Sequence, residues 1–343
     1  MPHANMPHAN RRGKAALITR RHALLLGGAM VAAPALLRGF RAEAAAPALG
    51  PTQQTFQRFR LGSFEVTSLL DASAMIDGPW PIVGEDRPAT EVEALMQANL
   101  LPAKRFRPGF SPLLVNTGRE LILFDAGNGA EGFVPPPAGG WLVKSLAAAG
   151  YTPEQIDVVV LTHAHPDHIG GLLTEGKPTF KNARYVIGAK EFDFWKADAP
   201  RKAPKESNEY RTAVMFRSYL QPLAEKARFL DPDGEVAPGI RAVKAYGHTP
   251  GHLAFHVESE GKRLLVWGDC AHHEVASLAR PQWHALFDQD KEAGVATRKQ
   301  IYDMAATEKL AVAGYHTSFP SIGYVERSGD GYRWLPVSYQ LDF

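Results

Sequence analysis

The chain has 343 residues, of which 45% are hydrophobic and 22% charged, a balance typical of a globular protein with a substantial core. This length allows one large domain or two small ones. Only one cysteine, Cys270, is present, which excludes an intrachain disulfide. Stability therefore has to come from the core and from any metal that the chain binds.

Residues 1–44 are predicted to be a leader segment rather than part of the fold. A basic stretch precedes an apolar run over 23–37, which is short for a membrane span and contains glycine and proline. The pair Arg20-Arg21 fits a twin-arginine signal, and an A-x-A site ends at Ala44. We expect export to the periplasm or the medium, with no stable membrane anchor after cleavage.

The charge of the chain depends on this leader. The formal net charge is +2, but residues 1–44 contain seven of the basic residues and one of the acidic residues, so the remainder has a net charge of −4. A remainder without excess positive charge argues against nucleic acid as a partner.

From residue 45 onward, the predicted elements begin with strands and then alternate between strands and helices. We expect strands over 61–70, 111–116, 120–124, 156–161, 183–187, 240–245, 253–258, 263–267, 310–313 and 332–337, and helices over 141–149 and 293–308. This order favours an α/β fold of two sheets covered by outer helices, a four-layer αββα sandwich, in one domain spanning 45–343. Two loops, over 134–140 and 198–208, are placed to form a pocket rim.

Four potential metal ligands follow the buried strand over 156–161, in the segment LTHAHPDHIGG: His163, His165, Asp167 and His168. Imidazole and carboxylate groups suit zinc, and also manganese, iron or cobalt. His163 and His165 can share one face of an extended segment, whereas Pro166 turns the chain before the other two. The segment therefore predicts two metal sites rather than one.

Three later strand ends have the same form, an apolar strand followed by glycine and a ligand-type residue. They are YGHTPGH with His248 and His252, LLVWGDC with Asp269 and Cys270, and AVAGYHTSFP with His316. Four ligands cannot fill two coordination spheres, so these strand ends are the candidates for the remaining ligands.

The motif HxHxDH, followed by GHTPGH, GD and a late histidine, resembles the metallo-β-lactamase superfamily. Within it, AAGYTPEQID, KEFDFW and HTSFPSIGYVERSGDGYRWLPVSY resemble the branch of methyl parathion hydrolase and its periplasmic relatives. The resemblance implies the metallo-β-lactamase fold, a binuclear metal centre that would hold two Zn²⁺ ions, and a homodimer.

The resemblance also implies a role for each ligand. His163, His165 and His252 would hold the first metal, Asp167, His168 and His316 the second, and Asp269 would bridge both. It leaves His248 as a structural residue, and it places Asp125 behind the ligands, where it would orient a histidine. Cys270 is an alternative to Asp269, but its side chain should point the opposite way along an extended segment.

The implied reaction is hydrolysis by a metal-bridging hydroxide, because two metals can lower the pKa of a shared water to about 7. Asp167 and Asp269 would be the catalytic carboxylates. The implied substrates are small and neutral, namely organophosphate triesters of the methyl parathion kind, together with aryl esters or lactones. Alternatives are an acyl-homoserine-lactone lactonase and, with less support, a β-lactamase or an iron-dependent oxidoreductase. The expected pocket-wall residues are Trp195, Phe133, Tyr210 and His273, with His272 beside them.

Overall fold

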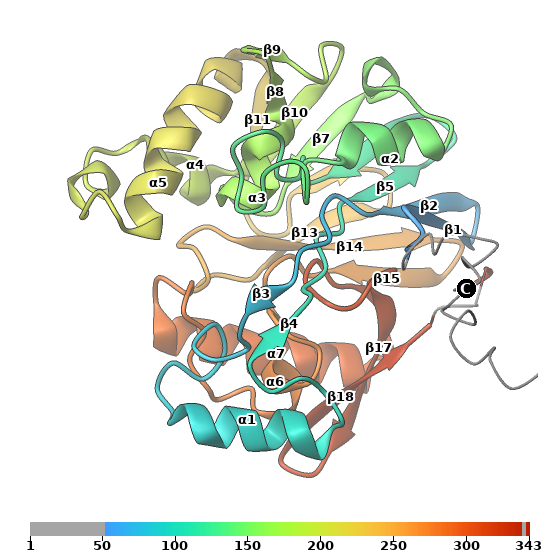
Figure 1. Ribbon diagram of the computed structural model, residues 1–343. Coiled ribbons are helices and arrows are strands. Elements are labelled where there is room, and N and C mark those ends of the chain that lie inside the picture. Colours follow the sequence, from blue (N-terminus) through green and yellow to red (C-terminus); the bar gives the residue numbers. More distant parts are fainter. Residues whose placement is uncertain (1–51, 338–340) are drawn as a thin grey trace, which may run out of the picture. The chain divides into compact units, whose positions relative to one another are not determined.

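The computed structural model describes residues 52–337 and 341–343, so the predicted leader over 1–44 lies outside the described residues. Residues 53–343 form one compact unit. Two seven-stranded sheets build most of this unit (Figure 1).

The first sheet carries strands from the N-terminal half of the unit. Its order is β1 (Phe56–Leu61), β2 (Phe64–Leu69), β5 (Leu113–Asn116), β6 (Leu121–Phe124), β7 (Val158–Leu161), β10 (Arg184–Gly188) and β11 (Ala227–Leu230). Pairing is antiparallel from β1 to β6 and parallel from β6 to β11. Because β7 lies between two parallel neighbours, all four of its residues are buried and apolar.

The second sheet carries the later strands. Its order is β12 (Glu235–Ala237), β13 (Ile240–Lys244), β14 (Leu253–Ser259), β15 (Lys262–Val266), β16 (Ala311–Ala313), β17 (Ile322–Ser328) and β18 (Gly331–Pro336). Only β15 and β16 pair in parallel, and α7 (Lys291–Thr307) lies in the connection between them. Two short ribbons complete the strands, β3 (Ile76–Asp77) with β4 (Arg105–Phe106) and β8 (Leu173–Thr174) with β9 (Lys177–Pro178).

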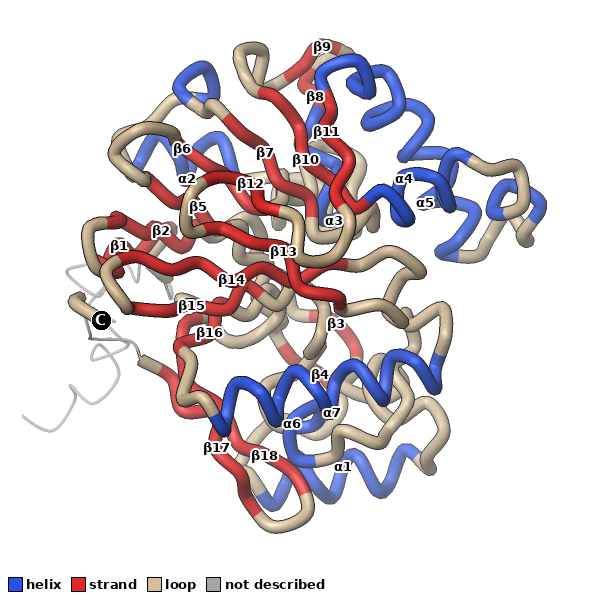
Figure 2. Tube along the Cα trace, turned by 180° about the vertical axis from the view of Figure 1, so that it is seen from behind, coloured by secondary structure: helices blue, strands red, loops and turns tan. Residues whose placement is uncertain are grey.

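Successive side chains along each strand point to opposite faces of its sheet. This alternation creates three cores, which separate four layers. Val158 and Val160 of β7 face the second sheet, whereas Val159 and Leu161 face the outer helices. The helices on the outer side of the first sheet are α2 (Leu142–Ala148), α4 (Ala189–Lys196) and α5 (Asn208–Met215). On the far side of the second sheet, α7 packs over β15 and β16 (Figure 2). The predicted αββα sandwich is confirmed.

A smaller core beside the sheets holds elements that the sequence does not predict. It joins α1 (Ala89–Ala98), β4 and α6 (Ala276–Ala279) through Val92, Met96 and Phe106. The first predicted strand also differs from the structure. It was expected as one strand over 61–70, but the chain turns at Gly62 and forms the hairpin of β1 and β2. Among the described residues, no helix combines the length and apolarity that crossing a membrane requires.

Candidate metal centre and substrate pocket

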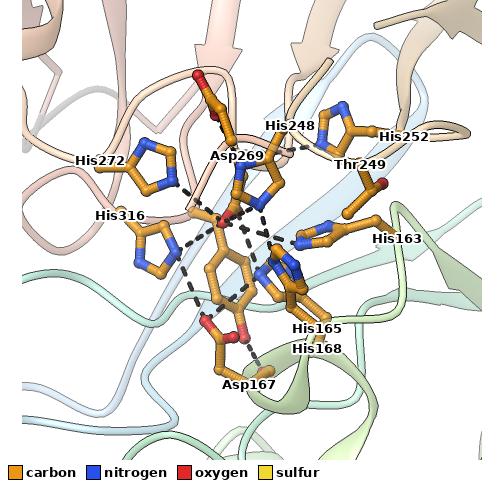
Figure 3. Close-up of polar contacts among 12 residues, drawn as sticks. His163, His165, Asp167, His168, His248, Thr249, His252, Asp269, His272 and His316 are labelled. Carbon is orange, nitrogen blue, oxygen red and sulfur yellow. Dashed lines mark hydrogen bonds and ion pairs between the residues drawn. The ribbon is translucent and has the colours of Figure 1, made fainter. Parts of the chain in front are cut away.

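The predicted ligands meet where strands of both sheets end. His163 and His165 follow β7, and the short helix α3 (Pro166–Ile169) then turns the chain, so that Asp167 and His168 lie on its first turn. The second sheet contributes the connection between β13 and β14, Asp269 after β15, and His316 after β16. Figure 3 shows these side chains converging from separate segments.

The first group of converging donor atoms consists of His163, His165, His248 and Asp269. The two predicted ligands after β7 are present, but the histidine from GHTPGH is His248 and not His252. Nε2 of His248 lies 2.9 Å from Nδ1 of His165 and 3.2 Å from Oδ2 of Asp269.

The geometry therefore disagrees with the assignment of the ligand role to His252. Nδ1 of His252 donates to the carbonyl oxygen of Ala245 at 2.9 Å, and Nε2 accepts from the backbone N–H of Asp269 at 3.1 Å. With both ring nitrogens engaged in protein hydrogen bonds, His252 offers no free lone pair. His252 therefore has a structural place, the role that the family resemblance implies for His248.

The second group of donor atoms is the predicted one, Asp167, His168 and His316. Oδ2 of Asp167 lies 3.4 Å from Nε2 of His168 and 3.5 Å from Nε2 of His316. All three residues are buried. The expected division of HxHxDH between two groups, on either side of Pro166, agrees with this placement.

Asp269 lies between the two groups. Its Oδ2 is 3.2 Å from Nε2 of His248 and 3.8 Å from Nε2 of His163, and its Oδ1 is 3.1 Å from Nε2 of His168. Cys270, the alternative ligand, instead packs in the core with the rings of Trp267 and Tyr302. The position of Asp269 is that of a carboxylate shared by both groups.

Hydrogen bonds behind the cluster fix which ring nitrogen faces it. Nδ1 of His168 donates to Asp125 at 2.9 Å, Nδ1 of His248 to Asp288 at 3.0 Å, and Nδ1 of His316 to the carbonyl of Gly109 at 2.9 Å. Each bond sets the tautomer so that the Nε2 lone pair points inward. Asp125 thus orients a histidine, as expected from the resemblance.

The donor set fits two divalent metal ions. Nε2 of His163, Nε2 of His168 and Oδ1 of Asp269 are buried and make no hydrogen bond among the described residues, although the last two atoms lie 3.1 Å apart, and all three face the cluster. A buried polar atom without a partner is costly, so such a concentration indicates that something else binds there. Imidazole nitrogen and carboxylate oxygen are ligands that zinc accepts.

The charges of the cluster also suit cations. Burial lowers the pKa of His163 and of His165 well below the ordinary value, so both rings are neutral at pH 7. Burial would raise the pKa of Asp269, but the imidazoles of His316 and His168 outweigh it and hold the pKa well below the ordinary range. Nearby carboxylates raise the pKa of His168, His248 and His316, so these three rings would release a proton on binding a metal ion, which an ionised carboxylate and the neutral rings of His163 and His165 would not need to do.

A largely apolar pocket opens over the cluster. Its floor includes His165, Asp167, Asp269 and His316. Its walls are formed by Ile76, Ile82, Phe106, Pro108, Phe110, Phe133, Pro166, Asn208, His272 and Phe287. No lysine or arginine belongs to this lining among the described residues. The pocket therefore suits a neutral, apolar group.

Of the four predicted pocket residues, only Phe133 belongs to this lining. Trp195 is wholly buried in the helix core, where Nε1 donates to Glu191 at 2.7 Å. Tyr210 lines an adjoining surface groove, and His273 accepts the N–H groups of Val275 and Ala276 at the start of α6. The predictions for Trp195 and His273 are therefore wrong, because helix packing and capping hold these side chains away from the pocket.

The structure also reveals buried polar residues near the site that the sequence does not predict. Asp288 binds both His248 and the buried Arg298, and Glu191 contacts two of the ligand-bearing loops. His272, treated only as a neighbour of the site, lies in the pocket wall. The sequence gives little indication of these roles, because each of these residues is a single polar residue in an ordinary helix or loop.

Comparison with known proteins agrees with this architecture. The family described as "Metallo-beta-lactamase superfamily" matches residues 107–301, more than half of the chain. An N-acyl homoserine lactonase of Bacillus cereus is 27% identical over 209 residues, which cover 59% of this chain and 74% of the lactonase. A second N-acyl homoserine lactonase, from Bacillus sp, is 29% identical over 208 residues, which cover 59% of this chain and 74% of that lactonase.

Two solved structures are similar over 84% of this chain and 100% of their own length, each at 26% sequence identity. One is AidC, described as a dizinc quorum-quenching lactonase in complex with a product, at a TM-score of 0.75. The other is the hydrolase AbOPH of the β-lactamase superfamily, at a TM-score of 0.76. The fold and donor set are those of a binuclear metallo-hydrolase, and the chain belongs to the metallo-beta-lactamase superfamily.

Proposed function

We propose that the protein hydrolyses the lactone ring of N-acyl homoserine lactones at a centre of two Zn²⁺ ions. The observation that carries the proposal is the apolar pocket directly above the two donor groups, because it offers an acyl chain a place beside the reacting carbonyl. Similarity to lactonases in sequence and structure supports the same substrate class.

We propose His163, His165 and His248 as ligands of the first ion and Asp167, His168 and His316 as ligands of the second, with Asp269 shared. When bound, the two ions would supply a nucleophile from water at neutral pH and polarise the ester carbonyl. Asp125 and Asp288 hold His168 and His248 in the required tautomers.

The pocket walls contribute orientation and the exclusion of water. The rings of Phe110 and Phe133 stack with their centroids 6.2 Å apart, and Phe133 also contacts the edge of Phe287. An acyl chain between such side chains would hold the lactone carbonyl over Asp269 and His316, at the pocket floor.

A second candidate activity is hydrolysis of neutral aryl esters or organophosphate triesters, as the resemblance to methyl parathion hydrolase implies. The aromatic walls and the lack of a basic side chain in the described lining favour it over a β-lactamase, because a β-lactam carboxylate would find no cationic partner. Export by the twin-arginine route and homodimer assembly stay predictions.

The test is a substrate panel with the zinc-saturated protein. It contains N-butanoyl-, N-hexanoyl- and N-decanoyl-homoserine lactone, methyl parathion, an aryl acetate and a cephalosporin. We expect kcat/KM to be at least tenfold higher for the best lactone than for methyl parathion, and KM to fall as the acyl chain lengthens. A higher kcat/KM for methyl parathion would select the second candidate, and turnover of the cephalosporin alone would refute both.

A further inference from the structure

Glu191 is a buried carboxylate outside both groups of proposed ligands. It lies in the first turn of α4, on the side of this helix that meets the metal centre, and its exposed fraction is 0%. Burial raises the pKa of its carboxyl group, whereas the hydrogen bonds that it accepts act in the opposite direction. A buried carboxylate is costly to keep unless its oxygens are satisfied, so its partners indicate its role.

Each of the two carboxylate oxygens of Glu191 accepts two hydrogen bonds. Oε1 accepts from the backbone N–H of Ala164 at 2.9 Å and from Nε1 of Trp195 at 2.7 Å. Oε2 accepts from Oγ1 of Thr249 at 2.6 Å and from the backbone N–H of Gly251 at 3.0 Å. Three of the four donors belong to loops of the metal centre.

The positions of these donors connect Glu191 to one metal site. Ala164 lies between His163 and His165, and Thr249 directly follows His248 in the chain. Figure 3 shows Thr249 in the same region as His163 and His252. Among the described residues, the hydrogen bonds of Glu191 reach positions directly beside His163, His165 and His248, and none reaches Asp167, His168 or His316.

Close backbone packing reinforces this connection. A Cβ atom added to Gly251 would lie 2.0 Å from the backbone nitrogen of Glu191 and 2.4 Å from its Cα. The GHTPGH loop therefore rests directly on the first turn of α4, and only a residue without a side chain permits that approach. The loop has little freedom to move independently of Glu191.

We propose that Glu191 is a positioning residue that holds the loops of His163, His165 and His248 at the spacing that the first metal ion requires. This inference rests on the ligand assignment in the proposed function. Residues behind the ligands commonly change metal affinity by about 10–100-fold when they are replaced. Because its contacts favour one group, Glu191 should affect the two ions unequally.

The experiment measures both zinc affinities by titration of metal-free protein against a chromophoric chelator. In Glu191→Gln, an amide group would face the N–H of Gly251, so one donor loses its acceptor. We expect one affinity to fall about 10–100-fold and the other to change by less than about threefold. Thr249→Val removes a single hydrogen bond to Glu191 and should lower the same affinity by a smaller factor.

A double-mutant cycle identifies the weakened site. Glu191→Gln should have no further effect on the ion that remains in His248→Ala, but it should keep its effect in His316→Ala. The matched control is Asp71→Asn, because Asp71 is equally buried and accepts three hydrogen bonds, from two groups of Asn128 and from the N–H of Leu142. Because Asp71 interacts electrostatically with Asp167 of the second group, this variant should lower the melting temperature and leave the affinity for the first zinc ion unchanged.

Unchanged affinities in Glu191→Gln, or an equal loss at both sites, would overturn the inference. A loss of affinity for the first ion in Asp71→Asn as well would also overturn it, because Glu191 would then contribute only to general stability. Failure of the proposed function has a different signature: the wild-type protein would bind two zinc ions, with the predicted response to Glu191→Gln, and hydrolyse no lactone.

Discussion

At the scale of single residues, the candidate centre depends on which nitrogen of each imidazole is already occupied. His248, His168 and His316 each donate from Nδ1 to a fixed acceptor behind the cluster, which directs Nε2 into the cluster. For His248 the acceptor is Asp288, which Arg298 binds at 3.0 Å. Burial lowers the pKa of His248, but Asp269 and Asp288 outweigh it and raise the pKa to about 9, so Nε2 would release its proton on binding a metal ion. The second layer of side chains therefore defines the ligand set.

Replacing the two histidines of GHTPGH one at a time tests the ligand assignment. In His248→Ala, the affinity for the first ion should fall by more than roughly 100-fold, which is the largest loss expected from replacing a residue behind the ligands. His252→Ala should still bind two ions but lose roughly 2–4 kcal/mol of unfolding free energy, since Asp269 N–H and Ala245 C=O lose their partner. Zinc content and thermal unfolding measure both effects. If His252→Ala lost an ion and His248→Ala kept both, His252 would be the ligand, as the sequence predicts.

His273 gives the protein a pH dependence that is independent of metal. Burial lowers its pKa from 6.5 to about 4, and its Nδ1 accepts two backbone N–H groups, which requires the neutral ring. As the pH falls below about 6.5, His273 becomes protonated in the unfolded chain but stays neutral in the folded protein. The contribution of His273 to the unfolding free energy is therefore fully present above that pH and is lost progressively down to about pH 4. The difference corresponds to roughly 3 kcal/mol.

His273→Asn keeps an acceptor at this position but cannot titrate. Between pH 7 and pH 4, the metal-free variant should therefore lose roughly 3 kcal/mol less unfolding free energy than the metal-free wild type. Urea unfolding at both pH values gives the comparison, and the other buried histidines cancel because both proteins contain them. Identical losses would show that the pKa of His273 is the same in the folded and the unfolded protein.

At the scale of elements, the centre is made by strand ends and by the loops that pack on them. Gly251→Ala tests the closest of these contacts, because the new methyl group would overlap the backbone of α4 at Glu191. Backbone on both sides leaves no flexible atom to move, so we expect a loss of roughly 3 kcal/mol or more in unfolding free energy.

A suitable comparison is Gly261→Ala, in the turn between β14 and β15. Its backbone has φ +74°, which an alanine adopts at a cost of about 1–2 kcal/mol, but no atom lies within 4 Å of the added carbon. In calorimetric unfolding, the melting temperature of Gly251→Ala should be well below that of Gly261→Ala. Equal melting temperatures would mean that the GHTPGH loop can move away from α4.

Strands with buried apolar runs were predictable at this scale, and helix faces were not. The strand expected over 156–161 is β7, within two residues at each end, because burial on both faces produces a continuous apolar run. The strand expected over 263–267 is β15, whose last three residues are buried and apolar. For Trp195, by contrast, the sequence KEFDFW contains three aromatic residues on eight residues of helix, and only packing decides which of them faces the core. His248 and His252 have similar neighbours, so the path of the loop, and not the motif, decides between them.

At the scale of the whole molecule, the proposed centre connects the two sheets. His163, His165, Asp167 and His168 extend from the first sheet, whereas His248, Asp269 and His316 extend from the second. Metal bound there joins both sheets and should stabilise the described unit as one body. The helix-side cores and the sheet interface were predictable as a layered fold. The pocket wall from β3 and β4 was not, because it joins segments distant in the sequence.

Removal of metal should accordingly lower the stability of the entire unit. A ligand at a thousand times its Kd stabilises the folded state by about 4 kcal/mol, so two ions should raise the melting temperature by at least several degrees. The measurement is calorimetric unfolding with excess chelator and with increasing zinc. A melting temperature that does not respond to zinc would argue against sites that bridge the sheets.

The central claim is that two ions at this centre produce lactone hydrolysis. Its most direct test follows the initial rate of N-hexanoyl-homoserine lactone hydrolysis while zinc is added stepwise to metal-free protein. The rate should rise from near zero and reach its plateau at two zinc ions per chain. A rate independent of zinc, a plateau at one ion, or no hydrolysis at two bound ions would contradict the account.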